Sequence, residues 1–330
     1  MLKYAPENLP QCTMKTLYPD ITPFDTFYLD TSSNHKIYVE QSGNPDGIPV
    51  VFLHGGPCSG TKPDHRCFFN PKVYRIILFD QRGCGKSLPF GELVDNHTAA
   101  LLEDLENIRI QLHIRQWLLF GGSWGATLAL LYAQQHPKHV SALIIRGVFL
   151  ARKTDLDWFI ETGANKIYPE QWQRLMHCIP KSHAANLLHE LYTALESDDE
   201  LTQRRIAKEW NAWNAQVALG NAFQVNSESQ HVHEHLVKQV RMEVNYAYHN
   251  YFIAENQILK HCDRLQHIPT VIIHGRNDLV CPLEAADSLH KALPHAQYIV
   301  LPHSGHIAKG DEMLNALVSA TDNMALLLSS

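Results

Sequence analysis

The clearest chemical signal in the sequence is a serine surrounded by glycines. Gly121-Gly122-Ser123-Trp124-Gly125 follows a segment that we expect to be a strand and opens one that we expect to be a helix. This is the context of a nucleophile elbow, a strained turn that brings neighbouring backbone close to the serine Cα and therefore needs glycine. With 17 glycines in 330 residues, chance would place such a pattern around some serine in roughly 4% of sequences. Ser123 is therefore the candidate nucleophile.

A serine hydroxyl needs an oriented base before it can attack a carbonyl carbon. In a fold with this elbow, an acid and a histidine follow the serine along the chain, each just after a strand. Asp278 and His306 both stand shortly after an expected strand. His303 is the nearest rival base, but the chain order and the glycine before His306 favour Ser123, Asp278 and His306 as a triad.

An oxyanion formed during such an attack needs backbone N–H donors from two places. One is the residue after the nucleophile, Trp124, and the other comes from a loop after an earlier strand. His54-Gly55-Gly56-Pro57 ends an expected strand, and its glycines allow the backbone to turn inward. We expect Gly56 and Trp124 to be the two donors.

The elements that would position these residues alternate between strand and helix over the first 150 residues. Short apolar segments ended by Gly or Asp are typical of buried parallel strands, and they occur at 48–54, 74–80, 117–120 and 141–146. Between them, 98–112 and 126–136 show helical periodicity. The alternation predicts an α/β fold with a mostly parallel central sheet and helices on both faces.

The strand pattern stops near residue 150 and resumes with apolar segments at 270–275 and 297–301. The stretch between contains amphipathic segments with several tryptophans and no segment rich in Val and Ile. We therefore predict a core formed by 1–150 and 256–330, split by a helical cap insertion at 151–255.

Composition and charge exclude several classes of protein. Lys and Arg number 28 against 34 Asp and Glu, a net charge of −6, which argues against nucleic-acid binding. The longest apolar runs fall short of the ~18 residues of a membrane span, and the first residues do not form a signal peptide. The seven cysteines include no C-x-x-C pair, so we expect neither a disulfide framework nor a zinc site and place the protein in the cytoplasm.

Metal binding is not expected elsewhere in the sequence either. The histidines of His231-x-His233-x-His235 alternate at a two-residue step, and we interpret them as a solvated polar segment. We expect no metal and no cofactor.

Taken together, the motifs resemble those of the prolyl aminopeptidase (proline iminopeptidase) family of the α/β-hydrolase fold. The resemblance runs from about Leu17 to the end of the chain. It implies a serine peptidase that hydrolyses the bond after the N-terminal residue of small peptides, proline preferred, through an acyl-enzyme. The matching motifs are Ser42-Gly43-Asn44-Pro45, His54-Gly55-Gly56-Pro57, Asp80-Gln81-Arg82-Gly83-Cys84-Gly85, Gly121-Gly122-Ser123-Trp124-Gly125, Arg146-Gly147, His274-Gly275-Arg276 with Asp278, and Ser304-Gly305-His306.

The resemblance also implies roles for further residues. The family's triad and oxyanion donors match the five residues named above. Phe149 and Phe159 lie where the family lines its pocket for the proline ring. Cys281 lies at the position of a thiol beside the catalytic aspartate, as in enzymes sensitive to mercurials.

Two positions depart from the family pattern. Cys58 stands where the family has glycine, so we expect a less pliable oxyanion loop. The family reads Trp-x-x-Trp-Glu in its cap, and that Glu helps to hold the substrate's α-amine, whereas this chain reads Trp210-Asn211-Ala212-Trp213-Asn214. A second amine-binding glutamate is matched by Glu243. We expect an amine pocket with one carboxylate and one amide.

Two other functions stay open from the sequence. Asn214 motivates an esterase or amidase of the same fold that does not need a free amine. A non-catalytic binding protein on a hydrolase scaffold is the other, and the intact Ser, Asp and His tell against it. The sequence carries no signal for the oligomeric state.

Overall fold

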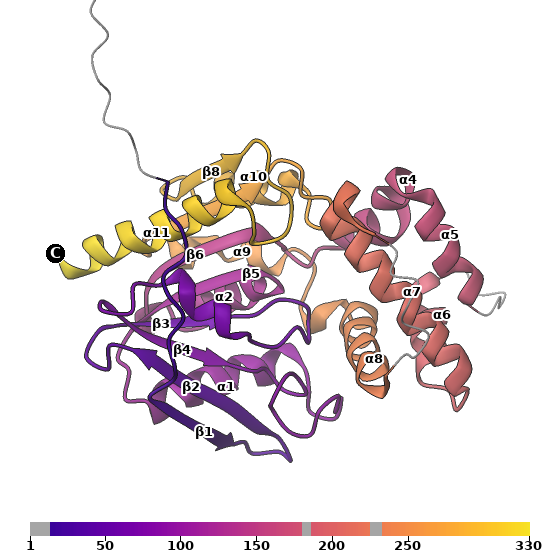
Figure 1. The fold of residues 1–330 in the computed structure, drawn as a ribbon, viewed down its shortest axis with the longest axis horizontal. Coiled ribbons are helices and arrows are strands. Elements are labelled where there is room, and N and C mark those ends of the chain that lie inside the picture. Colours follow the sequence, from indigo (N-terminus) through magenta and orange to yellow (C-terminus); the bar gives the residue numbers. More distant parts are fainter. Residues whose placement is uncertain (1–13, 180–185, 225–232) are drawn as a thin grey trace, which may run out of the picture.

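An eight-stranded sheet forms the centre of the computed structural model, which describes residues 14–179, 186–224 and 233–330 (Figure 1). Its order is β1-β2-β4-β3-β5-β6-β7-β8, and β3 to β8 are parallel. This confirms the mostly parallel sheet predicted from the alternating pattern. The strands are β1 (Asp25–Asp30), β2 (Lys36–Gly43), β3 (Ile48–Leu53), β4 (Tyr74–Phe79), β5 (Trp117–Ser123), β6 (Val140–Val148), β7 (Thr270–Gly275) and β8 (Gln297–Leu301).

The antiparallel strands β1 and β2 at one edge were not predicted. Strand β2 contains polar residues, which mask the apolar pattern of a buried strand in the sequence. In the fold these side chains are buried because they pair with polar neighbours. Arg66 Nε donates to Glu40 Oε1 at 2.7 Å, and Arg75 Nε donates to Gln41 Oε1 at 2.8 Å. The sequence shows the polar residues but not the partners that allow them to be buried.

Helices cover both faces of the sheet, as predicted. Alternate strand residues point to opposite faces, so Val51 and Leu119 pack in one apolar cluster while Val50 and Leu118 pack in the other. The first face is covered by α1 (Thr98–Gln111), α2 (Trp124–Gln135), α9 (Gln257–Lys260) and α10 (Leu283–Ala292), and the second by η1 (Pro63–Phe68) and α11 (Asp311–Ser329). Two short turns of helix, η2 (Pro137–His139) and η6 (Cys262–Leu265), lie in connecting loops.

The described helices between residues 153 and 252, which follow β6 along the chain, lie together at one end of the molecule (Figure 1). They surround an apolar cluster of their own, which contains Trp210 and Trp213. The division into a core of 1–150 with 256–330 and a cap of 151–255 stays a prediction. The helices are α3 (Lys153–Asp157), η3 (Trp158–Thr162), α4 (Ala164–Ile167), α5 (Pro169–Cys178), α6 (Leu187–Leu195), α7 (Glu200–Leu219), η4 (Gly220–Ala222), α8 (Glu234–Tyr248) and η5 (Asn250–Phe252).

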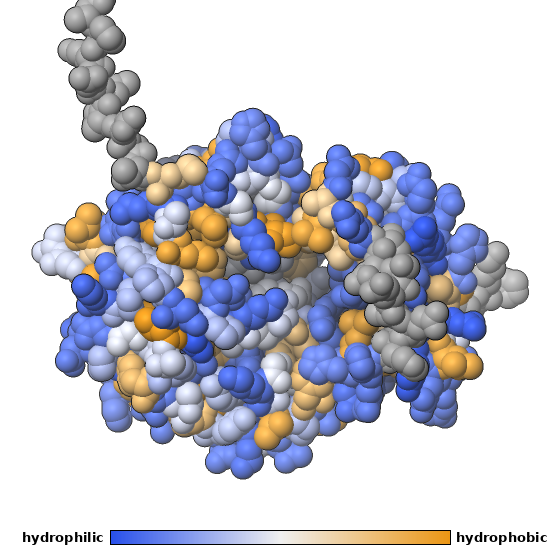
Figure 2. All heavy atoms as spheres, viewed as in Figure 1, coloured by the Kyte–Doolittle hydropathy of each residue, from blue (hydrophilic) through white to orange (hydrophobic). Residues whose placement is uncertain are grey.

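Hydrophilic residues cover most of the face shown in Figure 2. Across the described ranges, no helix combines the length and apolar character that crossing a bilayer requires. His231 and the first residues of the chain, both discussed above, lie outside the described residues.

Candidate active site

Ser123 lies at the junction of β5 and α2, where the backbone makes the strained turn that the sequence predicts. Its φ is +57° and its ψ is −125°, values that L residues rarely adopt. The glycines around it are required by close approach. A Cβ at Gly121 would lie 2.3 Å from the Gly125 carbonyl oxygen, and one at Gly125 would lie 2.0 Å from the Leu53 carbonyl oxygen. The elbow is therefore packed directly against β3.

Asp278 and His306 form a hydrogen-bonded pair. His306 Nδ1 donates to Asp278 Oδ2 at 2.8 Å, while Asp278 Oδ1 accepts the backbone N–H groups of Val280 at 3.0 Å and Cys281 at 2.8 Å. Burial opposes ionisation of this carboxyl, but the facing imidazole and the N–H donors hold its pKa below the usual range. Asp278 is thus a fixed, ionised acceptor for His306.

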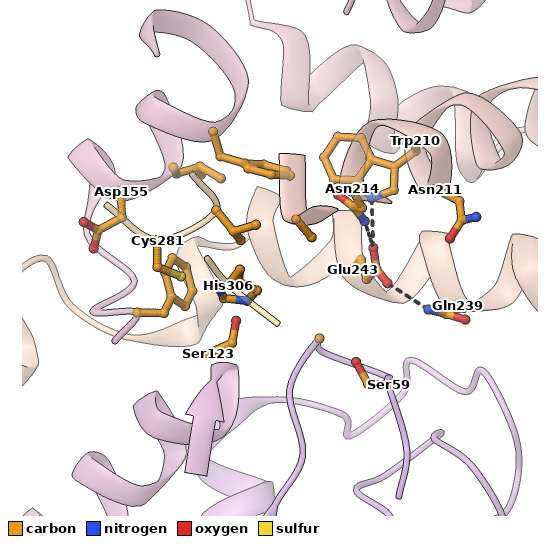
Figure 3. A pocket seen from close by; sticks show the side chains of 16 residues that line it. Ser59, Ser123, Asp155, Trp210, Asn211, Asn214, Gln239, Glu243, Cys281 and His306 are labelled. Carbon is orange, nitrogen blue, oxygen red and sulfur yellow. Dashed lines mark hydrogen bonds between the residues drawn. The ribbon is translucent and has the colours of Figure 1, made fainter. Parts of the chain in front are cut away.

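The structure brings Ser123 and His306 together at one cavity, side by side in Figure 3. The residues come from the carboxyl ends of parallel strands, where open α/β sheets place their sites. Gly147, with a φ of +49°, allows the pair to pack closely, since a Cβ there would lie 3.3 Å from His306 Cε1. The rival His303 is exposed and does not line the cavity.

His274 is a second buried histidine beside the pair, and its hydrogen bonds mark it as structural. Its Nδ1 accepts the Val148 N–H at 3.1 Å, and its Nε2 donates to the Cys281 carbonyl at 2.8 Å. Burial lowers its pKa. Both ring nitrogens are occupied, so His274 is a neutral support for the loop that carries Asp278.

The expected oxyanion donors lie on either side of the nucleophile. Trp124 is the first residue of α2, so its N–H has no partner within the helix. A Cβ at Gly55 would lie 3.5 Å from Ser123 Cβ, which places that loop against the nucleophile, and Gly56 lines the cavity. Gly56 has a φ of +112°, and a Cβ there would lie 2.7 Å from the Cys58 nitrogen. The arrangement fits the two donors, whose role stays a prediction.

Cys58 adopts a backbone conformation that suits glycine. Its φ is +78°, and its buried thiol donates to the Gly83 carbonyl at 3.7 Å. A side chain in this region is strained, which explains why glycine fits the position. The stiffer oxyanion loop expected from Cys58 stays a prediction.

The cavity has a volume of about 270 Å³ and contains every residue expected to bind substrate. Phe149 and Phe159 supply aromatic surface, and Glu243 and Asn214 lie across the cavity from Ser123 (Figure 3). The expected residues that line this one cavity are up to 250 positions apart in the sequence (Gly56 and His306).

Glu243 is held by three neutral donors. Its Oε2 accepts Trp210 Nε1 at 2.9 Å and Asn214 Nδ2 at 2.8 Å, and its Oε1 accepts Gln239 Nε2 at 3.1 Å. Burial raises the pKa of Glu243. No lysine or arginine of the described chain pairs with this carboxyl, so its charge is open to a cation that enters the cavity.

Sequence reasoning missed part of this network. Gln239 was not predicted, although it stands one helical turn before Glu243 on α8 and so shares its face. Asn214 was expected to offer an acceptor to the amine, but its amide nitrogen donates to Glu243. Its amide oxygen is the only acceptor left on that side chain.

Comparison with known proteins places this site in a family. The chain matches the family described as the alpha/beta hydrolase fold over residues 48–312. It is 42% identical to a proline iminopeptidase of Xylella fastidiosa (strain Temecula1) over 314 residues, covering 94% of this chain and 99% of the relative. It is also 42% identical to a proline iminopeptidase of Arabidopsis thaliana, covering 95% and 83%. The chain belongs to the proline iminopeptidase family of α/β hydrolases.

Solved structures share the fold at lower identity. VinJ superposes with a TM-score of 0.64 at 18% identity, over 93% of this chain and 100% of that chain. A proline iminopeptidase-related protein of Thermus thermophilus superposes with a TM-score of 0.55 at 19% identity, over 92% and 97%. These likenesses concern the fold alone and confirm the predicted α/β-hydrolase architecture.

The thiol that the family resemblance places beside the catalytic aspartate is Cys281. It is buried, lines the cavity, and donates its backbone N–H to Asp278. Burial, with Asp278 nearby, raises the pKa of this thiol well above its usual range. Cys281 is therefore a neutral thiol in the wall of the cavity.

One group of side chains has the spacing of a metal site. The ligand atoms of Glu106, His136 and His139 lie within 4.8 Å of one another. The Glu106 carboxylate already accepts from Arg109 at 2.6 Å and from the Tyr132 hydroxyl at 2.6 Å. The group lies at the end of α2 away from the elbow. Since a helix rises 1.5 Å per residue, the 12 residues of α2 separate the group from Ser123 by about 18 Å. The group is therefore outside the candidate active site.

Proposed function

We propose that this protein is a serine aminopeptidase that removes an N-terminal residue, proline preferred, from small peptides. The observation that carries the proposal is that Ser123, His306 and Glu243, a carboxylate with no cationic partner among the described residues, share one cavity. The family's curated relatives named proline iminopeptidase support the same activity. Small peptides as substrates and the cytoplasm as location stay predictions.

The arrangement supports attack on a peptide carbonyl. Ser123 Oγ bonds to the carbonyl carbon while His306 Nε2 takes the hydroxyl proton, and Asp278 holds the ring and stabilises its cation. The oxyanion is placed at the N–H groups of Gly56 and Trp124. His306 then gives the proton to the leaving nitrogen, the C–N bond breaks, and a water molecule activated by the same imidazole hydrolyses the acyl-enzyme.

The cap side of the cavity is suited to an N-terminal proline. A prolyl N-terminus is a secondary ammonium, whose burial is costly unless acceptors and opposite charge replace its water. Glu243 supplies the charge, and the Asn214 amide oxygen supplies a second acceptor. Phe149 and Phe159 provide the apolar surface for the ring.

Replacing Glu243 with glutamine should remove most of the selectivity for a free amine. A charge-assisted hydrogen bond contributes about 1.5–3 kcal/mol, so we expect the ratio of kcat/KM for prolyl to N-acetylprolyl β-naphthylamide to fall by about ten- to a hundredfold. Glu234→Gln, on the exposed start of the same helix, is the matched control and should leave the ratio unchanged. If free and acetylated substrates are cleaved equally by the unmodified protein, the esterase or amidase alternative replaces the proposal.

The same selectivity should depend on pH. Burial favours the neutral form of Glu243 and raises its pKa, so this carboxyl takes up a proton at a higher pH than an exposed one as the solution is acidified. The protonated form has no charge for the ammonium. The prolyl to N-acetylprolyl ratio should therefore fall as the pH is lowered from neutrality toward the ordinary glutamate pKa of about 4.3, and the decline should start above that value. Effects of pH on the catalytic step are common to both substrates and cancel. A flat ratio over this range would contradict the role of Glu243, and Glu243→Gln should show such a flat ratio.

Restoring the family glutamate at position 214 should strengthen binding of prolyl substrates. Asn214→Glu adds a second carboxylate where the amide now donates to Glu243. Because a charge-assisted bond replaces a neutral one, KM for prolyl β-naphthylamide should fall roughly tenfold. The control is Asn211→Asp, which tests whether any added negative charge in the cavity lowers KM. Asn211 lies on the same helix and lines the same cavity, but it is not one of the three donors to Glu243. An unchanged KM in Asn214→Glu would show that position 214 does not contact the amine.

A further inference from the structure

A second cavity of about 300 Å³ opens on the other side of the nucleophile. It shares Gly56, Ser59, Ser123 and His306 with the cavity that contains Glu243. A substrate whose carbonyl carbon lies at Ser123 therefore has one half in each cavity. Since the acyl half occupies the side with the amine-binding carboxyl, the second cavity lies on the side of the leaving group.

Arg146 is a charged group of this second cavity that lies beside the nucleophile. It stands opposite Gly122 in the pairing of β5 with β6. A Cβ at Gly122 would lie 2.6 Å from its Cζ, so the guanidinium rests on the backbone next to Ser123. Arg146 Nη1 donates to the His306 carbonyl oxygen at 2.7 Å.

The other donors of this guanidinium have no acceptor within the described chain. Arg66, Arg82 and Arg152, by contrast, each have a carboxylate at 2.6 to 2.7 Å. Among the residues that the structure describes, Arg146 forms no such ion pair. An arginine is always charged and binds carboxylates through two parallel N–H bonds, so this one is available to an anionic ligand.

One wall of the second cavity is apolar and suits an apolar side chain. Phe52, Phe68 and Phe120 form a stacked aromatic floor, with ring centroids 5.5 to 6.3 Å apart. His65 stacks on Phe52 at 4.2 Å, and burial lowers its pKa to about 4, so it is neutral at about pH 7. The charged rim residues Lys62, Asp64 and Lys309 are exposed.

We propose that this second cavity binds the residue after the scissile bond and that Arg146 binds the C-terminal carboxylate of that residue. This inference rests on the proposed function. The preferred substrate class is then a dipeptide with an N-terminal proline and an apolar second residue. Glu243 holds the ammonium in one cavity, and Arg146 holds the carboxylate in the other, on opposite sides of Ser123. The position of the guanidinium beside Gly122 limits its reach to the first residue of the leaving group.

The test compares prolyl-phenylalanine with prolyl-phenylalaninamide, which differ only in the terminal carboxylate. We expect kcat/KM of the unmodified protein to be at least about tenfold higher for the free acid, the discrimination given by one charged bidentate pair. Equal values, or a preference for the amide, would overturn the inference. Prolyl β-naphthylamide carries no carboxylate and tests the proposed function separately: if it is not cleaved, that function fails, and if it is cleaved while the two peptides are equal, only this inference fails.

Variants assign the effect to Arg146. In Arg146→Met the ratio of kcat/KM for the acid to that for the amide should fall to about one. Arg146→Lys keeps the charge but loses the paired N–H donors of the guanidinium, so its ratio should be intermediate. Any harm through the lost bond to the His306 carbonyl affects both peptides and cancels in the ratio. Arg276 is exposed and does not line the cavity, so Arg276→Met should keep the acid-to-amide ratio of the unmodified protein. A tenfold ratio retained in Arg146→Met would contradict the assignment, and the comparison in the unmodified protein stands even if that variant fails to fold.

Discussion

Ser123→Ala should lower kcat for prolyl β-naphthylamide by about 10⁶, because loss of a triad nucleophile removes the covalent step on which the other groups act. The fold should be unaffected, since the change removes one oxygen at the surface of the cavity. Steady-state rates with the purified variant, together with thermal unfolding, measure both statements.

The matched control for this variant is Ser141→Ala. Ser141 lies near the beginning of β6, at the end of the strand away from the active site. The rate of Ser141→Ala should therefore equal that of the unmodified protein. Hydrolysis by Ser123→Ala at the unmodified rate, with contaminating peptidase excluded, would remove Ser123 from the mechanism.

Asp278→Asn should lower kcat by about 10⁴, the scale expected when a triad histidine is held in the wrong tautomer. The reason lies in the two backbone N–H groups, of Val280 and Cys281, that bond to Oδ1. They require an oxygen there, so the asparagine must turn its amide nitrogen toward His306. That nitrogen donates to Nδ1, the ring proton moves to Nε2, and Nε2 can no longer accept the proton of Ser123.

Asp287→Asn is the control for this change, because Asp287 pairs with Lys291 on the exposed side of α10. It should not alter kcat. The tautomer can be read from the nitrogen chemical shifts of labelled His306, which should exchange their assignment between the unmodified protein and Asp278→Asn. Activity of Asp278→Asn within tenfold of the unmodified protein would mean that Asp278 does not orient the base.

The site could be predicted from the sequence because its constraints are local. The glycines around Ser123 are required by approaches of 2.0 to 2.3 Å to backbone, and such a requirement leaves a mark in a few adjacent residues. Asp278 and His306 follow strands whose apolar runs are short and clear. The ends of β7 and β8 were predicted to the residue.

Other features could not be predicted because they depend on partners distant in sequence. Strand β2 is hidden by Glu40, whose buried carboxylate is paired with Arg66 and Tyr38. The start of α2 was expected at Ala126 but lies at Trp124, since the helix begins directly at the elbow. The donors around Glu243 come from two helices, and no local pattern shows that Asn214 points its amide nitrogen at that carboxyl.

The central claim is that the protein hydrolyses substrates with a free N-terminal proline by means of Ser123 and Glu243. The most direct test compares kcat/KM for prolyl β-naphthylamide with that for a neutral acyl ester such as 4-nitrophenyl butyrate. We expect efficient cleavage of the prolyl substrate, its loss in Ser123→Ala, and little turnover of the ester. Efficient cleavage of the ester with no cleavage of the prolyl substrate would contradict it.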